Sequence, residues 1–181
     1  GTIIELAGTI TVIDGENVEL TVTATGTKPL TYRWSKDGAA IDEATTPGYT
    51  LDNTGQTVAG EYKLAVNQDG TLVGSAAITV VLAEPPIIVT QPVGGNADLG
   101  GAFTFEVVAT GTEPLSYEWT LGGAAVEGGT GSTLALTGLE AEDEGDYYVV
   151  VSNLAGTATS DTAALTLGTP PVVTQVSRST E

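Results

Sequence analysis

A cluster of carboxylates late in the chain is the group of residues best suited to chemistry. Five acidic side chains fall within seven positions, and they are Glu140, Glu142, Asp143, Glu144 and Asp146. Because oxygen ligands gathered on a loop can hold Ca²⁺, Glu142, Asp143, Glu144 and Asp146 are candidate ligands. Their spacing does not match an EF-hand loop, however, and a solvated turn before a strand is the alternative interpretation. We therefore expect no resident cofactor, with Ca²⁺ as the metal to test.

The residue types that remain exclude most forms of catalysis. The 181-residue chain contains no Cys, no Met and no His, which removes thiol nucleophiles, imidazole bases and the usual zinc ligands. Ser75 and Ser152 therefore have no imidazole to activate them, and Lys36 and Lys63 lack a partner pattern. Nothing in the sequence brings two carboxylates into one pocket, as a glycosidase requires. We predict that the chain is not an enzyme.

The charge of the chain excludes a second class of function. With 5 basic and 23 acidic residues the net charge is −18, so a nucleic acid would be repelled. Residues 85–168 contain no Lys or Arg and eleven acidic residues: Asp98, Glu106, Glu113, Glu118, Glu127, Glu140, Glu142, Asp143, Glu144, Asp146 and Asp161. Since no internal salt bridge can relieve this repulsion, we expect salt or divalent cations to raise the melting temperature of this part of the chain.

These residues lie in a sequence that repeats with an offset of 85 residues. Tyr32-Arg33-Trp34 returns as Tyr117-Glu118-Trp119, and Pro85-Pro86 returns as Pro170-Pro171. The residues after the second Pro-Pro pair echo those after the first. We therefore predict a first domain at residues 1–84, a second at residues 85–168, and a linker with the start of a third repeat at residues 169–181.

Each copy of the repeat has the pattern of short β-strands. Apolar and polar residues alternate in 18–24 and in 103–107, which is typical of a sheet with one buried face. Breaks rich in Gly and Asn punctuate the strands, as hairpin turns do. No segment has a sustained helical stripe, and residues 139–146 have room for one helical turn. The pattern predicts an all-β protein whose copies are two-sheet antiparallel sandwiches.

Two motifs carry a family resemblance. Trp119 is followed by Asp143-Glu144-Gly145-Asp146-Tyr147, an order that resembles the immunoglobulin fold, in particular the intermediate-set domains of bacterial and phage surface proteins. The resemblance covers both copies and implies two tandem immunoglobulin-like sandwiches joined by a short Pro-Pro linker. It places these residues in the structural core: Val22, Trp34, Tyr62, Leu64, Val107, Trp119, Tyr147 and Val149.

The chain departs from the family pattern in two ways. The resemblance implies that Val22 with Leu64, and Val107 with Val149, stand where other members have paired cysteines, so aliphatic packing must offset the loss of ~2 to 5 kcal/mol per disulfide. The first copy also has residues 57–60, Thr-Val-Ala-Gly, where the Asp-x-Gly motif is expected. In the family, Tyr62 and Tyr147 would form the tyrosine corner, a hydroxyl bonded back to an upstream carbonyl.

The resemblance implies a non-catalytic, surface-displayed array that acts as an extended spacer and weak attachment module. Its location would be extracellular or on the surface of a bacterial cell, or else on a phage virion. Its partners would be a cell-surface glycan or protein, or neighbouring copies of the array, without nucleic acid or membrane insertion. One alternative is an accessory module of a secreted polysaccharide-degrading enzyme, and another is a phage capsid decoration protein. Aromatic residues make up only 6% of the chain, and alternation leaves Tyr148 alone facing outward, which counts against a glycan-stacking platform.

Overall fold

Strands make up almost all the regular structure in the part of the chain that the computed structural model describes, residues 7–52 and 56–169. The residues group into two compact units, Gly1–Ala83 and Glu84–Glu181. The segment expected to start a third repeat, from residue 170 onward, lies outside the described residues. No helix in the described residues is long and apolar enough to cross a membrane.

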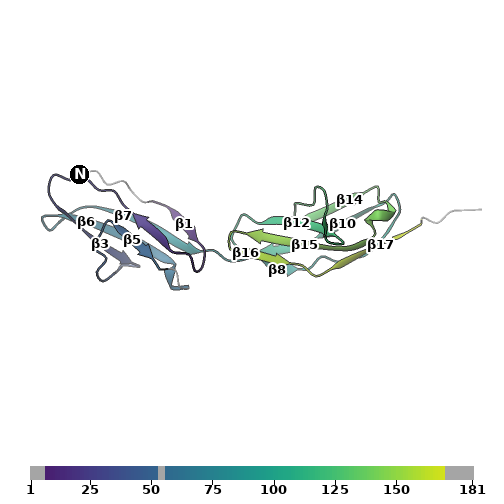
Figure 1. The fold of residues 1–181 in the computed structure, drawn as a ribbon, viewed down its shortest axis with the longest axis horizontal. Helices are drawn as coiled ribbons and strands as arrows, with labels where there is room; N and C mark the ends of the chain where they lie inside the picture. Colours follow the sequence, from purple (N-terminus) through teal and green to yellow (C-terminus); the bar gives the residue numbers. More distant parts are fainter. Residues whose placement is uncertain (1–6, 53–55, 170–181) are drawn as a thin grey trace, which may run out of the picture. The chain divides into compact units, whose positions relative to one another are not determined.

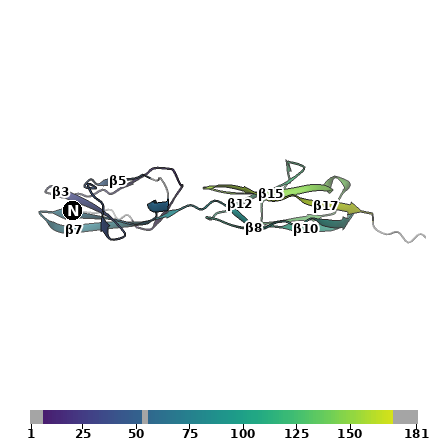
Figure 2. The same cartoon turned by 90° about the horizontal axis from the view of Figure 1, so that it is seen from below.

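Unit 1 is a two-layer sandwich (Figures 1 and 2). Its larger sheet has the strand order β1 (Thr9–Val12), β7 (Thr71–Leu82), β6 (Gly60–Gln68), β3 (Leu30–Lys36) and β4 (Ala39–Ala40). The second layer is the antiparallel pair of β2 (Val18–Thr21) and β5 (Gly48–Leu51). A short 3₁₀ turn, η1 (Gln56–Val58), precedes β6.

Unit 2 repeats this two-layer architecture (Figure 2). Its larger sheet has the order β13 (Ala124–Ala125), β12 (Ser116–Leu121), β15 (Gly145–Asn153), β17 (Ala163–Gly168) and β9 (Gly95–Asp98), with β16 (Gly156–Thr159) on β15. The other layer holds two antiparallel pairs, β10 (Ala102–Glu106) with β14 (Thr133–Thr137), and β8 (Ile87–Thr90) with β11 (Val108–Thr110). The single helical turn expected within residues 139–146 is η2 (Ala141–Asp143).

The offset of 85 residues holds in the strand register as well as in the sequence. In the larger sheets Trp34 pairs with Leu64, and Trp119 pairs with Val149. The parallel pairs keep the same offset, since Ile10 faces Val80 and Gly95 faces Leu165. A residue of one copy can therefore be compared with its counterpart in the other as two occupants of one structural position.

Each unit closes its own core around one tryptophan. Trp34 is 1% exposed and Trp119 is fully buried, and each indole N–H donates to a backbone carbonyl twelve residues later, of Thr46 at 3.0 Å and of Gly131 at 2.8 Å. The structure buries every residue that the resemblance placed in the core: Val22, Trp34, Tyr62, Leu64, Val107, Trp119, Tyr147 and Val149. The aliphatic pairs at the cysteine positions thus lie in the interior of each sandwich.

One expected strand is shorter than alternation predicted. β2 ends at Thr21, although the apolar and polar alternation continues to Ala24. The facing strand β5 begins at Gly48, directly after Pro47. The Val22 N–H still donates to the Pro47 carbonyl at 3.1 Å, and in unit 2 the Val107 N–H donates likewise to the Ser132 carbonyl at 2.9 Å, where β10 ends at Glu106. The ladders of both units therefore stop at the equivalent residue, whether proline or serine lies opposite, and Val22 remains buried.

The boundary between the units falls between Ala83 and Glu84, one residue earlier than the Pro-Pro pair suggested. Ala83 belongs to unit 1, because its N–H donates to the Val12 carbonyl at 2.8 Å. Glu84 belongs to unit 2, because its N–H donates to Thr112 Oγ1 at 2.8 Å and its carbonyl accepts from Asn153 Nδ2 at 2.7 Å. The side chain of Asn153 thus fixes the start of a domain 69 residues earlier in the chain.

Candidate functional site

The acidic turn that sequence reasoning offered as a Ca²⁺ site is built around backbone hydrogen bonds. The Glu140 N–H donates to Asp143 Oδ2 at 2.8 Å, and the Leu167 N–H donates to Glu144 Oε2 at 3.1 Å. Two of the four candidate carboxylates therefore hold the turn and its neighbouring strand. Within residues 7–52 and 56–169, no three acidic side chains gather into a group that could hold a metal ion, so Glu142, Asp143, Glu144 and Asp146 are not brought together as ligands.

The turn also receives the hydroxyl of the buried Tyr147. Its O–H donates to the Asp143 carbonyl at 2.8 Å, and in unit 1 the Tyr62 O–H donates to the Val58 carbonyl at 2.9 Å. Both bonds reach back four residues, so the first copy keeps the corner without the Asp-x-Gly motif. The acceptor is a backbone carbonyl, which any residue supplies.

Burial raises the pKa of both corner tyrosines. For Tyr147 the largest cause is loss of hydration, and the nearby Asp143 carboxylate adds to the rise. For Tyr62 the causes are burial first, then Tyr49 and Asp37. Each phenol is therefore held neutral as a hydrogen-bond donor, and its role is to fix the fold rather than to transfer protons.

The hydroxyl and amine groups considered for catalysis lie in separate places. Ser75 is exposed on β7 and Ser152 is half-buried on β15. Lys36 donates to the Thr57 carbonyl, and its Nζ lies 5.7 Å from the centre of the Tyr62 ring, whereas Lys63 is exposed on β6. These contacts support strands and turns, and they assemble no nucleophile with a base.

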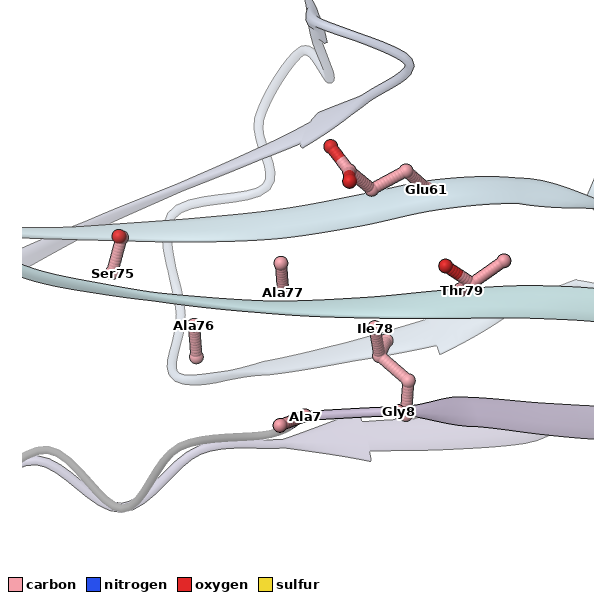
Figure 3. Close-up of a pocket in the computed structure, with 8 residues that line it drawn as sticks. All are labelled: Ala7, Gly8, Glu61, Ser75, Ala76, Ala77, Ile78 and Thr79. Atoms are coloured by element: carbon pink, nitrogen blue, oxygen red, sulfur yellow. The ribbon is translucent and has the colours of Figure 1, made fainter.

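A groove of about 390 Å³ in unit 1 runs along β7 beside the start of β1. Figure 3 shows Ser75, Ala77 and Thr79 on one side of β7, with Ala76 and Ile78 on the other. Glu61 is the one charged residue of its lining. A lone carboxylate with two hydroxyls lacks the second acid or base that hydrolysis needs, so this groove has no catalytic constellation.

A second groove, of about 330 Å³, lies on the outer face of β8, β10 and β11 in unit 2. Its lining is Thr90, Gln91, Val93, Thr104, Glu106 and Val108. Val93 is 76% exposed and Val108 is 42% exposed. Sequence reasoning missed both valines. Comparison of the two copies would have found them, because the first copy has Gly8 and Thr23 at these positions.

The Tyr148 side chain is less exposed than the alternation of the strand predicted. Tyr148 is half-buried, because β15 lies between β12 and β17 and Tyr148 faces Thr120 across the sheet. In the part of the chain that the structure describes, the large hydrophobic side chains with high exposure are all aliphatic. The surface thus offers small aliphatic patches and carboxylates rather than a stacking platform.

Comparison with known proteins agrees with this geometry. The family model described as "Immunoglobulin domain" matches residues 85–153. The fold is immunoglobulin-like. The I-band fragment I67–I69 of titin superposes with a TM-score of 0.71 at 19% identity, over 88% of this chain and 62% of that one. Sidekick-1 immunoglobulin domains 1–4 superpose with a TM-score of 0.60 at 17% identity, over 92% of this chain and 48% of that one.

Relatives at the sequence level come from animals and from a phage. Kin of IRRE-like protein 2 of Homo sapiens is 32% identical over 170 residues, which is 91% of this chain and 23% of that protein. The basement membrane-specific heparan sulfate proteoglycan core protein of Mus musculus is 31% identical over 166 residues, 88% of this chain and 4% of that protein. The decoration protein of Escherichia phage T5 is 33% identical over 84 residues, 46% of this chain and 51% of that protein.

These relatives widen the resemblance inferred from the motifs. The immunoglobulin-like fold is shared with animal proteins, so the motifs do not place the chain among bacterial or phage domains in particular. The chain spans about a quarter of the human relative and about half of the phage relative.

Proposed function

We propose that this immunoglobulin-like chain is a non-catalytic display module that spaces an attached protein from a surface and makes weak attachments. The observation that carries the proposal is the use of the polar groups. The corner tyrosines, Asp143, Glu144 and Asn153 are all engaged in holding the fold. These groups therefore form no catalytic arrangement in the described residues. The outer surface of the two sandwiches is what remains for function.

The charge of the surface fits display. A net charge of −18 keeps repeated domains soluble and apart, because like charges repel over about 10 Å at moderate ionic strength. Repeated domains raise avidity without a strong single site, because once one domain is bound, the next domain of the same molecule is already held close to the surface. The partners would be a cell-surface glycan or protein, or neighbouring copies of the array, at an extracellular or virion surface.

A capsid decoration role is a second candidate, because of one specific similarity. The decoration protein of phage T5 matches 84 residues of this chain at 33% identity. In this role one immunoglobulin-like unit would stand on a capsid and the exposed faces would be available outside. Binding to a phage capsid would distinguish this role from attachment to cells.

The test is binding of the fluorescently labelled chain to a glycan array, to intact bacterial cells and to purified phage capsids. Each is measured with Ca²⁺ and again with a chelator. Saturable binding to glycans or cells supports attachment, and saturable binding to capsids supports decoration. Release of sugar from any glycan overturns the non-catalytic assignment.

A variant separates a Ca²⁺ effect from damage to the fold. Glu142→Gln with Asp146→Asn removes two exposed carboxylates of the turn and leaves the hydrogen bonds of Asp143 and Glu144 in place. If chelation abolishes binding of the original chain and this variant binds equally poorly with Ca²⁺, the acidic turn is the Ca²⁺-dependent site. If the variant binds like the original chain, it is not.

A further inference from the structure

The outer face of β8, β10 and β11 in unit 2 carries exposed aliphatic side chains in one place. Val93 is 76% exposed and Val108 is 42% exposed. Val93 and Val108 line the same groove of about 330 Å³, together with Thr104 and Glu106. Single exposed valines are ordinary, but valines that meet in a hollow beside polar residues are the pattern of an interaction surface.

The sandwich does not need aliphatic residues at these positions. In unit 1 the counterparts of Val93 and Val108 are Gly8 and Thr23, and both are exposed. The positions are equivalent in the two units, because the parallel strand pairs beside them keep the offset of 85, with Ile10 facing Val80 and Gly95 facing Leu165. The two valines are therefore additions to the surface of unit 2 and not requirements of its core.

Charge selects what can occupy the groove. Glu106 lies in its lining, and residues 85–168 hold eleven carboxylates and no Lys or Arg. A second molecule of this chain would bring Glu106 against Glu106, and nucleic acids and anionic lipids would be repelled likewise. A cationic partner with aliphatic side chains would match both the valines and the field around them.

We propose that this groove docks a protein segment whose aliphatic side chains stand next to lysines or arginines. The aliphatic groups cover Val93 and Val108, and a cation pairs with Glu106. The inference rests on the proposed display function and names the partner chemistry of one face. Six lining residues are far fewer than the roughly 20 to 30 per side of a stable interface, so each contact is weak and acts through repetition.

The experiment is an NMR titration of the ¹⁵N-labelled chain with three synthetic peptides of equal length. One alternates lysine with valine, one alternates lysine with serine, and one alternates glutamate with valine. The lysine–valine peptide is expected to shift the amide signals of residues 89–91, of Val93 and of residues 104–108. The lysine–serine peptide should bind roughly tenfold more weakly, because it lacks the aliphatic contact, and the glutamate–valine peptide should leave these signals unchanged.

Variants locate the effect at the groove. Val93→Thr with Val108→Thr keeps the side-chain shape and the fold, and it is expected to weaken the lysine–valine peptide roughly tenfold. Leu154→Ser, which removes a 44% exposed aliphatic side chain from the β15–β16 turn, should have no effect. Equal binding of the lysine–valine and lysine–serine peptides, or undiminished binding to the valine double variant, overturns the proposal.

Other occupants have their own signatures. Dimer formation in sedimentation velocity that the valine double variant abolishes would assign the face to a second molecule instead. A failed titration together with saturable binding to cells leaves the display function in place and removes only the groove. Successful titration without binding to cells, glycans or capsids supports the groove and removes the attachment role.

Discussion

Replacement of Tyr147 by Phe tests the interpretation that the polar groups of the acidic turn serve the fold. The phenol is 1% exposed, and its O–H donates to the Asp143 carbonyl at 2.8 Å. Tyr147→Phe keeps the ring and leaves this carbonyl without its donor, which costs about 1 to 2 kcal/mol. In a domain of this size, each 1 kcal/mol lowers the melting temperature by about 4–8 °C, so we expect a fall of roughly 4–16 °C at neutral pH.

The same substitution has a pH signature. The pKa of Tyr147 is raised above its ordinary value of 10.0 in the folded state, by burial and then by the Asp143 carboxylate. A raised pKa means that the folded state holds the proton more tightly, so this stabilisation is complete below pH 10 and is lost as the pH rises above 10. Phenylalanine does not titrate. The difference in melting temperature between the original chain and Tyr147→Phe should therefore shrink above pH 10.

The assay is differential scanning calorimetry between pH 7 and 11 with two controls. Tyr148→Phe removes a hydroxyl from the half-buried neighbour outside the corner, and we expect a change within about 0.5 kcal/mol. Tyr62→Phe should produce the same behaviour in unit 1, and so identifies which transition belongs to which unit. An unchanged melting temperature at pH 7, or a difference that stays constant across pH 10, would refute the reasoning.

Three further predictions follow from the cores, the charge and the domain boundary. Two double variants, Val107→Cys with Val149→Cys and Val22→Cys with Leu64→Cys, should each form a disulfide on oxidation. Mass spectrometry would detect each disulfide as a loss of two hydrogens. Failure of both pairs to oxidise contradicts the alignment with the family cysteine positions. Raising NaCl from about 10 to 500 mM, or adding Ca²⁺, should raise the melting temperature of unit 2 more than that of unit 1. The reason is that residues 85–168 contain no Lys or Arg, whereas Lys28 of unit 1 pairs with Asp69. A melting temperature that responds to neither salt nor Ca²⁺ counts against the charge argument. Asn153→Ala removes the donor to the Glu84 and Thr112 carbonyls at 2.7 and 2.8 Å and so loosens the Glu84 carbonyl, which also accepts from the Thr112 N–H at 3.0 Å. The Thr112 amide should therefore exchange with solvent faster, whereas Leu154→Ala in the same turn should leave that exchange unchanged; equal exchange in the two variants would contradict this role of Asn153.

The interior of each unit was predictable because the residue types that fill a sandwich core follow from the strand pattern in the sequence. Alternation in the strands assigns every second residue to the core, and one large indole per copy fixes what packs around it. Trp34 and Trp119 accordingly occupy equivalent registers opposite Leu64 and Val149. The corner bond of Tyr62 also follows from position, because its acceptor is a backbone atom.

Other features depend on contacts that no local pattern contains. β2 ends at Thr21 and β10 ends at the equivalent Glu106, although the alternation of apolar and polar residues continues beyond both. The membership of Glu84 in unit 2 is decided by the Asn153 amide, 69 residues away. The hydrogen bonds of the acidic turn could not be predicted for the same reason, since the Glu144 carboxylate accepts from the Leu167 N–H, 23 residues away.

The difference between the two copies is the part of the sequence that bears most directly on function. Positions that hold the fold keep their chemistry at the offset of 85, as the tryptophans and corner tyrosines do. An outward position is free of that constraint, so Gly8 and Thr23 satisfy the sandwich in unit 1 as well as Val93 and Val108 satisfy it in unit 2. An exposed valine offers the folded monomer less than a polar residue would, because its surface remains in water. Two such valines in one groove favour a contact outside the unit, and for that reason the groove of unit 2, rather than the acidic turn, is where a partner should be sought.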